Sequence, residues 1–432
     1  MFELIVVSFA GILIGMLAGL LPALPVFTGP LILYYFVQDY YPVEYLLVFW
    51  LASYSGTQFF GSIATITTRI PGEESAAIYL KDIDNLSLDQ KRNLLYDTAL
   101  GSYIAATLSL IFVWVVVKYT GIGTFPQLMG LPVQMVVYAF AILLFFFIQP
   151  KKWFATLLII ALGLMIGPRQ NYALPDIWYN IQQWFHGYTL YMVVMGTIIF
   201  PTLLEPVQQA VNVERFGRVR NRGYSVLAGL RSTLIGAVAG LIPGPSASVA
   251  TAFAYRTGGS SSYRRILNAE TANNSAVVTC ALPFFLLGLP INQNTLLMSN
   301  IMDVQSLDIV TAIQETGMFG WTIFDLVIGV ALLVMVVYFW LSTNLIDLYA
   351  GLVQRLHHRM PYVVGIILLA LIAVDLQYAE IGLAHYLTLL VLFTVFGIML
   401  RKLKISAIPF LFAIILADKI IWLGIQASAI YF

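Results

Sequence analysis

The amino-acid sequence predicts an all-α, polytopic membrane protein. Its 432 residues are 60% hydrophobic and only 10% charged, whereas a soluble globular protein has about 25% charged residues. The apolar residues form long continuous runs, such as "ATLSLIFVWVVVKY" and "DLVIGVALLVMVVYFWL", without the alternation of an outer-membrane barrel. Because a helix needs about 20 apolar residues to cross the hydrocarbon, these runs predict about nine to twelve transmembrane helices or half-helices.

Composition also limits which partners and covalent features we expect for this chain. A formal net charge of +1 gives no reason to expect nucleic acid as a partner. The single cysteine, Cys280, lies in an apolar run, where packing is its simplest role, and no disulfide within the chain is possible. The first residues lack a basic stretch and a small-residue cleavage site, so we expect an uncleaved first helix and not a signal peptide.

Two pairs of similar motifs predict an internal repeat. "GMLAGLLPALP" (Gly15–Pro25) resembles "GAVAGLIPGPS" (Gly236–Ser246) at a spacing of 221 residues. Further along, "TRIPGEES" (Thr68–Ser75) aligns with "LGLPINQN" (Leu287–Asn294) at a spacing of 219 residues. Two matches in the same order indicate that the chain consists of two related halves.

The positions of charged residues predict that the halves are inverted. We expect a first half at 1–205, a basic cytoplasmic linker at 206–222 and a second half at 223–432. Lys and Arg in short loops mark the cytoplasm, and the first broken segment has acidic neighbours while its counterpart in the second half has arginines on both sides. An inverted repeat with broken helices or re-entrant hairpins is typical of secondary transporters.

Further basic stretches help to place the loops. "PKK" (Pro150–Lys152), "RLHHR" (Arg355–Arg359) and "RKLK" (Arg401–Lys404) are expected on the cytoplasmic side. "KDIDNLSLDQKR" (Lys81–Arg92) carries both signs of charge, which leaves its side of the membrane open.

Four interruptions of the apolar runs, at 20–30, 69–77, 242–248 and 288–294, predict a binding site at membrane depth. Pro-Gly breaks free backbone N–H and C=O groups, which are tolerated there only where protein or a water-filled cavity satisfies them. A helix that starts after a break favours an anion such as a carboxylate; the alternative is a simple kink or close helix packing. The candidate substrate-binding residues at the breaks are Pro22, Pro25, Arg69, Pro71, Gly72, Pro243, Gly244, Ser246, Asn292 and Gln293.

Polar residues within the neighbouring helices extend this candidate site. Asn273 and Asn274 are adjacent in "AETANNS", and the repeat places Tyr54 and Ser55 at the equivalent positions. We expect Ser53, Tyr54, Ser55, Thr57, Asn273 and Asn274 to contact substrate. Oxygens of Ser55, Glu270, Asn273 and Asn274 are expected to bind the coupling ion. The alternative for the two asparagines is hydrogen bonding between helices.

Charged residues within apolar runs are functional candidates by default. Arg69 is placed to make a bidentate contact to a carboxylate, and the alternative is an ion pair with a neighbouring glutamate or snorkelling. Asp325 and Asp375 also lie in apolar helices. The four histidines are scattered and make no metal-binding pattern, so we expect no metal and no cofactor beyond Na⁺ as a coupling ion.

These motifs resemble the large membrane subunit of the tripartite tricarboxylate transporters, the TctA family. That family has a Pro-Gly loop, a Glu-x-x-Asn-Asn helix and a second glycine-proline loop, and the first half carries a Tyr-Gly stretch leading to Ile-Pro-Gly-Glu. The matching positions are Tyr54, Gly56, Phe60, Gly61, Ser62, Pro71, Gly72, Glu73, Pro243, Gly244, Glu270, Asn273, Asn274, Gly288 and Pro290. The first loop departs from the family at 22–25, and the last departs at 291–293, which leaves the substrate open.

The resemblance implies a small TctB-type membrane subunit, a TctC-type periplasmic solute-binding protein and a bacterial-type inner membrane. It also implies uptake driven by a Na⁺ or proton gradient. We therefore expect a secondary active transporter for an organic carboxylate such as a tricarboxylate or dicarboxylate, and not an enzyme. A homodimer is an expectation from transporters of similar build. The alternatives are a channel or facilitator for another small solute, an intramembrane enzyme and a component that only docks partners.

Overall fold

The computed structural model describes residues 2–20, 43–68, 74–120, 150–167, 176–203, 226–242, 246–287, 321–346, 360–379, 381–405 and 407–431, with a few single positions between these ranges. Helices form nearly all of this backbone, so the predicted all-α class is confirmed. Among the described residues, three helices are long and apolar enough to cross a membrane, namely Leu88–Tyr119, Ile323–Asn344 and Leu383–Lys402. The total of about nine to twelve spans stays a prediction, because several apolar runs lie outside the described residues.

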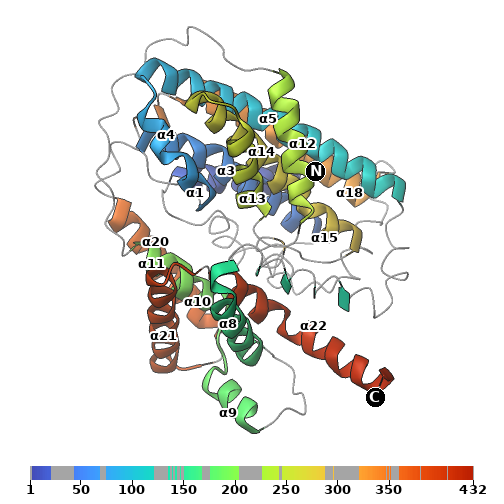
Figure 1. Cartoon of the computed structure of the whole chain (residues 1–432), viewed down its shortest axis with the longest axis vertical. Helices are drawn as coiled ribbons and strands as arrows, with labels where there is room; N and C mark the ends of the chain where they lie inside the picture. Colours follow the sequence, from blue (N-terminus) through green and yellow to red (C-terminus); the bar gives the residue numbers. More distant parts are fainter. Residues whose placement is uncertain are drawn as a thin grey trace.

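The helices form two groups, one above the other in Figure 1, each with its own hydrophobic core. The first bundle contains α1 (Phe2–Leu20), α3 (Val43–Thr68), the 3₁₀-helix η1 (Glu74–Tyr79), α4 (Leu80–Asp84), α5 (Leu88–Thr120), α12 (Val226–Gly240), α13 (Ser246–Thr257), α14 (Ser262–Thr279), α15 (Ala281–Leu287) and α18 (Ile323–Asn344). The second bundle contains η2 (Pro150–Lys152), α8 (Trp153–Ile166), α9 (Asp176–Trp184), α10 (Leu190–Val194), the π-helix η3 (Met195–Ile199), α11 (Phe200–Leu203), α20 (Met360–Tyr378), α21 (Leu383–Lys402) and α22 (Ile408–Tyr431).

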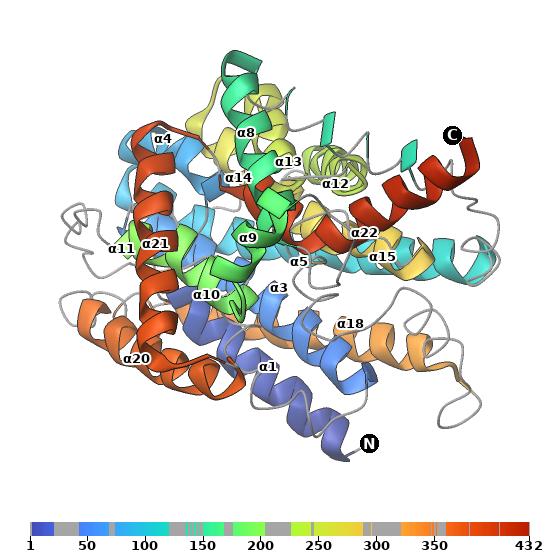
Figure 2. The ribbon, with the colours of Figure 1, turned by 90° about the horizontal axis from the view of Figure 1, so that it is seen from below.

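Each bundle combines helices from both predicted halves of the chain. In the first bundle, α5 packs against both α14 and α18, and α18 also packs against α3 (Figure 2). In the second bundle, α8 packs against α22 and η3 packs against α21. The boundaries of the two halves stay predictions, and the linker at 206–222 lies outside the described residues.

Local sequence signals explain where several helices begin and end. Ser87 and Gln90 form a reciprocal capping box at the start of α5, in which the Gln90 N–H donates to Ser87 Oγ at 3.3 Å and the Ser87 N–H donates to Gln90 Oε1 at 3.0 Å. Helix α14 ends at Thr279, four residues before Pro283. Because proline has no N–H and its ring clashes with the carbonyl four residues earlier, the chain bends there and α15 follows.

One of the four predicted breaks is described on both sides. Helix α12 ends at Gly240, a turn and a bend follow at 241 and 242, and α13 begins at Ser246. The apolar run is thus interrupted at 242–248, where the sequence predicts a break. The breaks at 20–30, 69–77 and 288–294 lie wholly or largely outside the described residues.

Helices α1 and α3 approach so closely at Gly15 that their backbones are in contact. A Cβ atom added to Gly15 would lie 2.6 Å from the carbonyl oxygen of Ser53 and 2.9 Å from Cα of Gly56. Both of these atoms belong to the backbone and cannot move aside like a side chain. The approach of the two helices therefore requires glycine at this position.

The second half repeats this packing between α12 and α14. A Cβ atom added to Gly236, the repeat counterpart of Gly15, would meet the carbonyl oxygen of Ala272 and Cβ of Ser275. These two residues lie 219 positions after Ser53 and Gly56, which is the spacing found between the second pair of sequence motifs. The two helix pairs thus use equivalent residues for their contact.

One turn further along, the same relation holds again. A Cβ atom on Gly19 would lie 2.9 Å from the carbonyl oxygen of Thr57, and one on Gly240 would lie 2.8 Å from the carbonyl oxygen of Ala276. Residues 57 and 276 are again 219 positions apart. This recurrence supports two related helix pairs, while their inverted orientation in a membrane stays a prediction.

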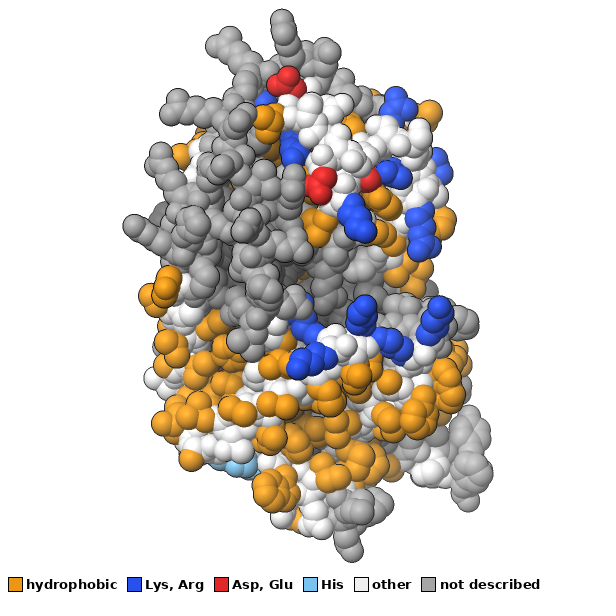
Figure 3. Space-filling model, turned by 60° about the vertical axis from the view of Figure 1, so that its left-hand side comes forward, with side chains coloured by type: hydrophobic (Ala, Val, Ile, Leu, Met, Phe, Trp, Pro, Cys, Tyr) orange, Lys and Arg blue, Asp and Glu red, His pale blue; other side chains and the backbone are white. Residues whose placement is uncertain are grey.

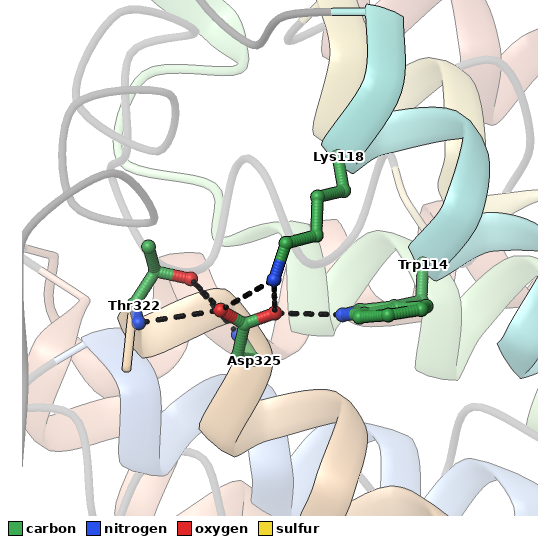
Figure 4. Close-up of polar contacts among 4 residues, drawn as sticks. All are labelled: Trp114, Lys118, Thr322 and Asp325. Carbon is green, nitrogen blue, oxygen red and sulfur yellow. Dashed lines mark hydrogen bonds and ion pairs between the residues drawn. The ribbon is translucent and has the colours of Figure 1, made fainter. Parts of the chain in front are cut away.

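Asp325 joins the start of α18 to the end of α5 (Figure 4). Its carboxylate accepts hydrogen bonds from Trp114 Nε1 at 2.6 Å and Thr322 Oγ1 at 2.9 Å, and Lys118 Nζ lies 3.2 Å away. Its own N–H donates to Thr322 Oγ1 at 3.1 Å, completing a capping box. Asp325, a functional candidate because of its place in an apolar run, has a role in capping and helix packing in the structure.

We expect Gly15→Ala to lower the free energy of unfolding by about 1–3 kcal/mol, because the added methyl group overlaps backbone atoms of α3. The measurement is thermal or denaturant unfolding of the purified protein in detergent. Gly329→Ala in α18 is the control, since nothing lies within 4 Å of a Cβ added there. A Gly15→Ala variant as stable as the Gly329→Ala variant would contradict the required close approach.

We expect Asp325→Ala to lower the free energy of unfolding by about 1–3 kcal/mol, because it removes a helix cap and leaves Trp114 Nε1 without its acceptor. Lys118→Gln should cost less than about 1 kcal/mol, because the Lys118 side chain is 48% exposed. Both variants are compared by unfolding in the same detergent. Equal losses for the two variants would show that the ion pair, and not the cap, holds these helix ends.

Candidate functional site

The two adjacent asparagines of α14 reach two different helices. Asn273 Nδ2 donates to Gln58 Oε1 of α3 at 2.9 Å, and Asn274 Nδ2 donates to Ser102 Oγ of α5 at 2.9 Å. Asn274 also donates to the Glu270 backbone carbonyl at 3.0 Å. Because neighbouring residues on a helix point about 100° apart, this pair can join α14 to α3 and α5 at one level of the bundle.

The polar contacts continue along α14 on both sides of the asparagines. The Glu270 carboxylate accepts a hydrogen bond from the Tyr79 hydroxyl at the end of η1. Ser275 Oγ lies 2.8 Å from Ser109 Oγ of α5 and donates to the Thr233 carbonyl of α12 at 2.7 Å. Helix α14 thus makes polar contacts with η1, α3, α5 and α12.

These side chains are almost fully removed from the surface. Glu270, Asn273 and Asn274 are 3%, 1% and 2% exposed. Burying an amide or carboxylate without a partner costs several kcal/mol in an apolar interior. The observed contacts are the hydrogen bonds between helices that were the alternative role for the two asparagines. Their contact with substrate stays a prediction.

The candidate residues of α3 are also buried. Ser53 Oγ donates to the Phe49 carbonyl at 2.8 Å, and Thr57 Oγ1 donates to the Ser53 carbonyl at 2.8 Å. Both hydroxyls thus bond to their own helix backbone. The Tyr54 ring stacks on Trp50 with a centroid distance of 5.5 Å, and Ser55 is buried.

The structure brings some of the predicted site together and leaves other parts undescribed. Helices α3 and α14 pack against each other, so the polar positions of both repeats lie in one bundle. Ser246 is described as the buried first residue of α13. The remaining predicted positions lie outside the described residues, and they are Pro22, Pro25, Arg69, Pro71, Gly72, Pro243, Gly244, Asn292 and Gln293.

The partners of the asparagines are not among the residues predicted from the sequence. Gln58 lies in the same stretch as the predicted residues of α3, and its buried amide in an apolar run is a signal that could have identified it. Ser102 lies in α5, more than 170 residues before Asn274 in the chain. A single serine in an apolar helix carries no such signal, because its hydroxyl can bond to its own backbone.

Charged residues gather where α14 begins. Arg265 lies 2.7 Å from Asp82 Oδ2, and the Tyr255 hydroxyl donates to the same oxygen at 2.9 Å. The Tyr263 hydroxyl donates to Asp97 Oδ2 at 2.7 Å. The segment at 81–92, which the charge pattern left open, therefore lies beside the basic start of α14.

The second bundle contains a buried carboxylate of its own. Asp375 of α20 is fully buried, and its Oδ2 accepts hydrogen bonds from Thr189 Oγ1 at 2.6 Å and the Tyr386 hydroxyl at 2.7 Å. Thr189 also caps α10 by accepting from the Met192 N–H at 3.0 Å. The π-helix η3 follows α10 directly, and such irregular turns are frequent at functional sites.

No group of three His, Cys, Asp or Glu side chains in the described ranges is arranged to hold a metal ion. The polar contacts of α14 instead combine amide, hydroxyl and carboxylate groups, which suit a small polar solute or an alkali cation better than a transition metal.

Comparison with known proteins adds an independent observation. A family model described as "Tripartite tricarboxylate transporter TctA family" matches residues 5–412. This match confirms the resemblance that the motifs predicted. An "Uncharacterized 52.8 kDa protein in TAR-I ttuC' 3'region" from Agrobacterium vitis is 24% identical over an alignment of 315 positions, which covers 66% of this chain and 61% of that protein. The match thus spans about three fifths of that relative's length, and no solved structure matches the chain.

Proposed function

We propose, because this chain belongs to the tripartite tricarboxylate transporter TctA family, that it is the permease that takes up an organic carboxylate through the membrane. The family consists of transporter components, so the expectation that the chain is not an enzyme is confirmed. The proposed substrates are tricarboxylates or dicarboxylates. Transport is proposed to be secondary and active, with a Na⁺ or proton gradient as its energy source.

The proposal includes two partner proteins and a location. A tripartite system implies a small TctB-type membrane subunit and a TctC-type solute-binding protein that delivers the substrate. The chain would lie in a bacterial-type inner membrane as a multi-pass protein. A homodimer is part of the proposal only by analogy with transporters of similar build.

The arrangement that supports binding is the presence, in one bundle, of helices next to three of the predicted breaks. Helix α3 precedes the break at 69–77, α15 precedes the break at 288–294, and α13 follows the Pro-Gly-Pro sequence. All three belong to the bundle in which α14 makes its buried polar contacts. We propose that the substrate carboxylates bind at the breaks, where backbone N–H groups and the start of α13 favour negative charge.

The proposed ion site uses oxygen ligands of α14 and α3. Glu270 supplies a carboxylate, Asn273 and Asn274 supply amide oxygens, and Ser55 supplies a hydroxyl. Hard cations such as Na⁺ favour oxygen ligands of this kind. The amide nitrogens of both asparagines donate to neighbouring helices, and their amide oxygens are the proposed ligands.

A channel or facilitator for another small solute is the second candidate. It would share the polar helices and the breaks but would not couple solute flux to an ion gradient. Uptake into proteoliposomes with and without an imposed Na⁺ or proton gradient separates the two. Accumulation above the external concentration requires coupling, whereas a facilitator only equalises the concentrations.

We expect Asn274→Ala to abolish carboxylate uptake while the protein is still produced and folded. The reason is that the variant removes an oxygen proposed for the ion site as well as the hydrogen bond to Ser102. Uptake is measured with labelled citrate and a labelled dicarboxylate in cells that also produce the two partner proteins.

Ser102→Ala is the matched control, because it removes the same interhelical hydrogen bond from the α5 side. It should lower the free energy of unfolding by about 1 kcal/mol and retain uptake. If both variants lose uptake in proportion to their loss of stability, Asn274 only joins helices, and the site assignment is wrong.

We expect a substrate carboxylate to raise the unfolding temperature of the purified protein in detergent. A ligand that binds only the folded state stabilises it by about 2.7 kcal/mol at a hundredfold excess over its dissociation constant. A shift with citrate or a dicarboxylate in Na⁺ but not in K⁺ supports Na⁺ coupling. If no carboxylate shifts the unfolding temperature in either Na⁺ or K⁺, this result would count against direct substrate binding by this chain.

A further inference from the structure

Five basic residues gather at one end of the second bundle. Lys151 and Lys152 form η2 at the start of α8, Arg401 and Lys402 close α21, and Lys404 follows shortly after. Lys152 Nζ donates to the backbone carbonyls of Leu403 and Lys404, the latter at 2.8 Å. These contacts hold the two segments together, and we call the five residues Lys151, Lys152, Arg401, Lys402 and Lys404 the basic end.

The basic end lies where a membrane span stops. The span Leu383–Lys402 is long and apolar enough to cross the bilayer, and its last residue belongs to the basic end. Trp153 and Phe154 of α8 are 56% and 58% exposed beside it, and an exposed tryptophan is typical of the membrane–water interface. Figure 3 shows a row of Lys and Arg side chains along the border of a broad hydrophobic face.

The backbone at Lys404 is unusual for a lysine. Its φ of 55° is in the left-handed region, and it is the only residue other than glycine with positive φ in the described part of the chain. The Ile405 N–H donates to the Leu400 carbonyl and the Lys404 N–H to the Arg401 carbonyl, both at 2.8 Å. This is a Schellman motif, whose left-handed position is usually glycine. A lysine in this strained conformation is a candidate for a functional side chain.

We propose that the basic end binds the phosphate headgroup of an anionic phospholipid such as phosphatidylglycerol. Lys151, Arg401, Lys402 and Lys404 are all exposed, on two segments that Lys152 holds together, so their charges are accessible to an anionic headgroup. Exposed apolar side chains of α8 and α21, including Leu157 at 45% and Met399 at 46%, provide a surface for the acyl chains. The negative end of the helix dipole favours cations, which explains why Arg401 and Lys402 lie in the last turn of α21. It does not explain the backbone conformation of Lys404.

The test uses the full-length purified protein and native mass spectrometry in detergent. Phosphatidylglycerol, phosphatidylcholine and inorganic phosphate are titrated separately, which distinguishes a lipid headgroup from a free anion. The proposal predicts tight binding of phosphatidylglycerol only. Equal binding of both lipids, or equal affinity for inorganic phosphate, would overturn it. Failure to bind any of the three would also overturn it and favour an acidic protein partner.

The variants locate the binding. Lys151→Gln combined with Lys402→Gln should weaken phosphatidylglycerol binding about 30-fold, given the contribution of each surface cation near an anionic lipid. Lys81→Gln combined with Arg264→Gln removes the same charge from exposed positions of the first bundle and should leave binding unchanged. Equal weakening by both double variants would show a general effect of charge and overturn the site.

Lys404→Gly separates lipid binding from folding. Glycine adopts the left-handed conformation without strain, so this variant should unfold at the same temperature as the natural protein or at a higher one. Its affinity for phosphatidylglycerol should fall about fivefold through the loss of one cation. Unchanged lipid affinity in Lys404→Gly would remove that residue from the proposed site. The proposal does not depend on the identity of the transported solute.

Discussion

Hydrogen bonding inside an apolar interior is the constraint on which the first bundle depends. Water cannot satisfy the amides and carboxylate of α14 at this depth, so other helices must do so. Asn273 contacts α3, Asn274 contacts α5, and Ser275 contacts α5 and α12. These directional contacts set the rotation of α14 about its axis, which non-directional packing of leucine and valine could not do.

Close approach of the helices makes those contacts possible. The backbone of α12 can come near α14 because Gly236 and Gly240 have no side chains to separate them. At that distance Ser275 reaches the Thr233 carbonyl. Small residues and buried polar residues therefore act together in this bundle, as is typical of helix association in membranes, where lipid removes most of the hydrophobic driving force between helices.

The all-α class could be predicted from the sequence, because long apolar runs indicate helices. The break before α13 and the close glycine contacts of α1 with α3 and of α12 with α14 also agree with the sequence motifs, whereas the roles of the candidate site residues stay predictions. The pairing of Asp82 with Arg265 and of Asp375 with Tyr386 could not be predicted, because tertiary packing brings these residues together and no local period encodes it. The role of Asp325 could be predicted from the sequence, since Thr322 and Asp325 have the spacing of a capping box. Its position in an apolar run instead favoured the interpretation as a functional charge.

The hydrogen bond between Asn273 and Gln58 also limits how the bundle can move. If α14 slides along α3, this bond must break before another donor and acceptor come into line. A helix shift of one turn, about 5.4 Å, brings the next residues to the same face. Relative motion of these helices is therefore expected to occur in discrete steps between alternative registers, each with its own set of partners, and not as continuous sliding.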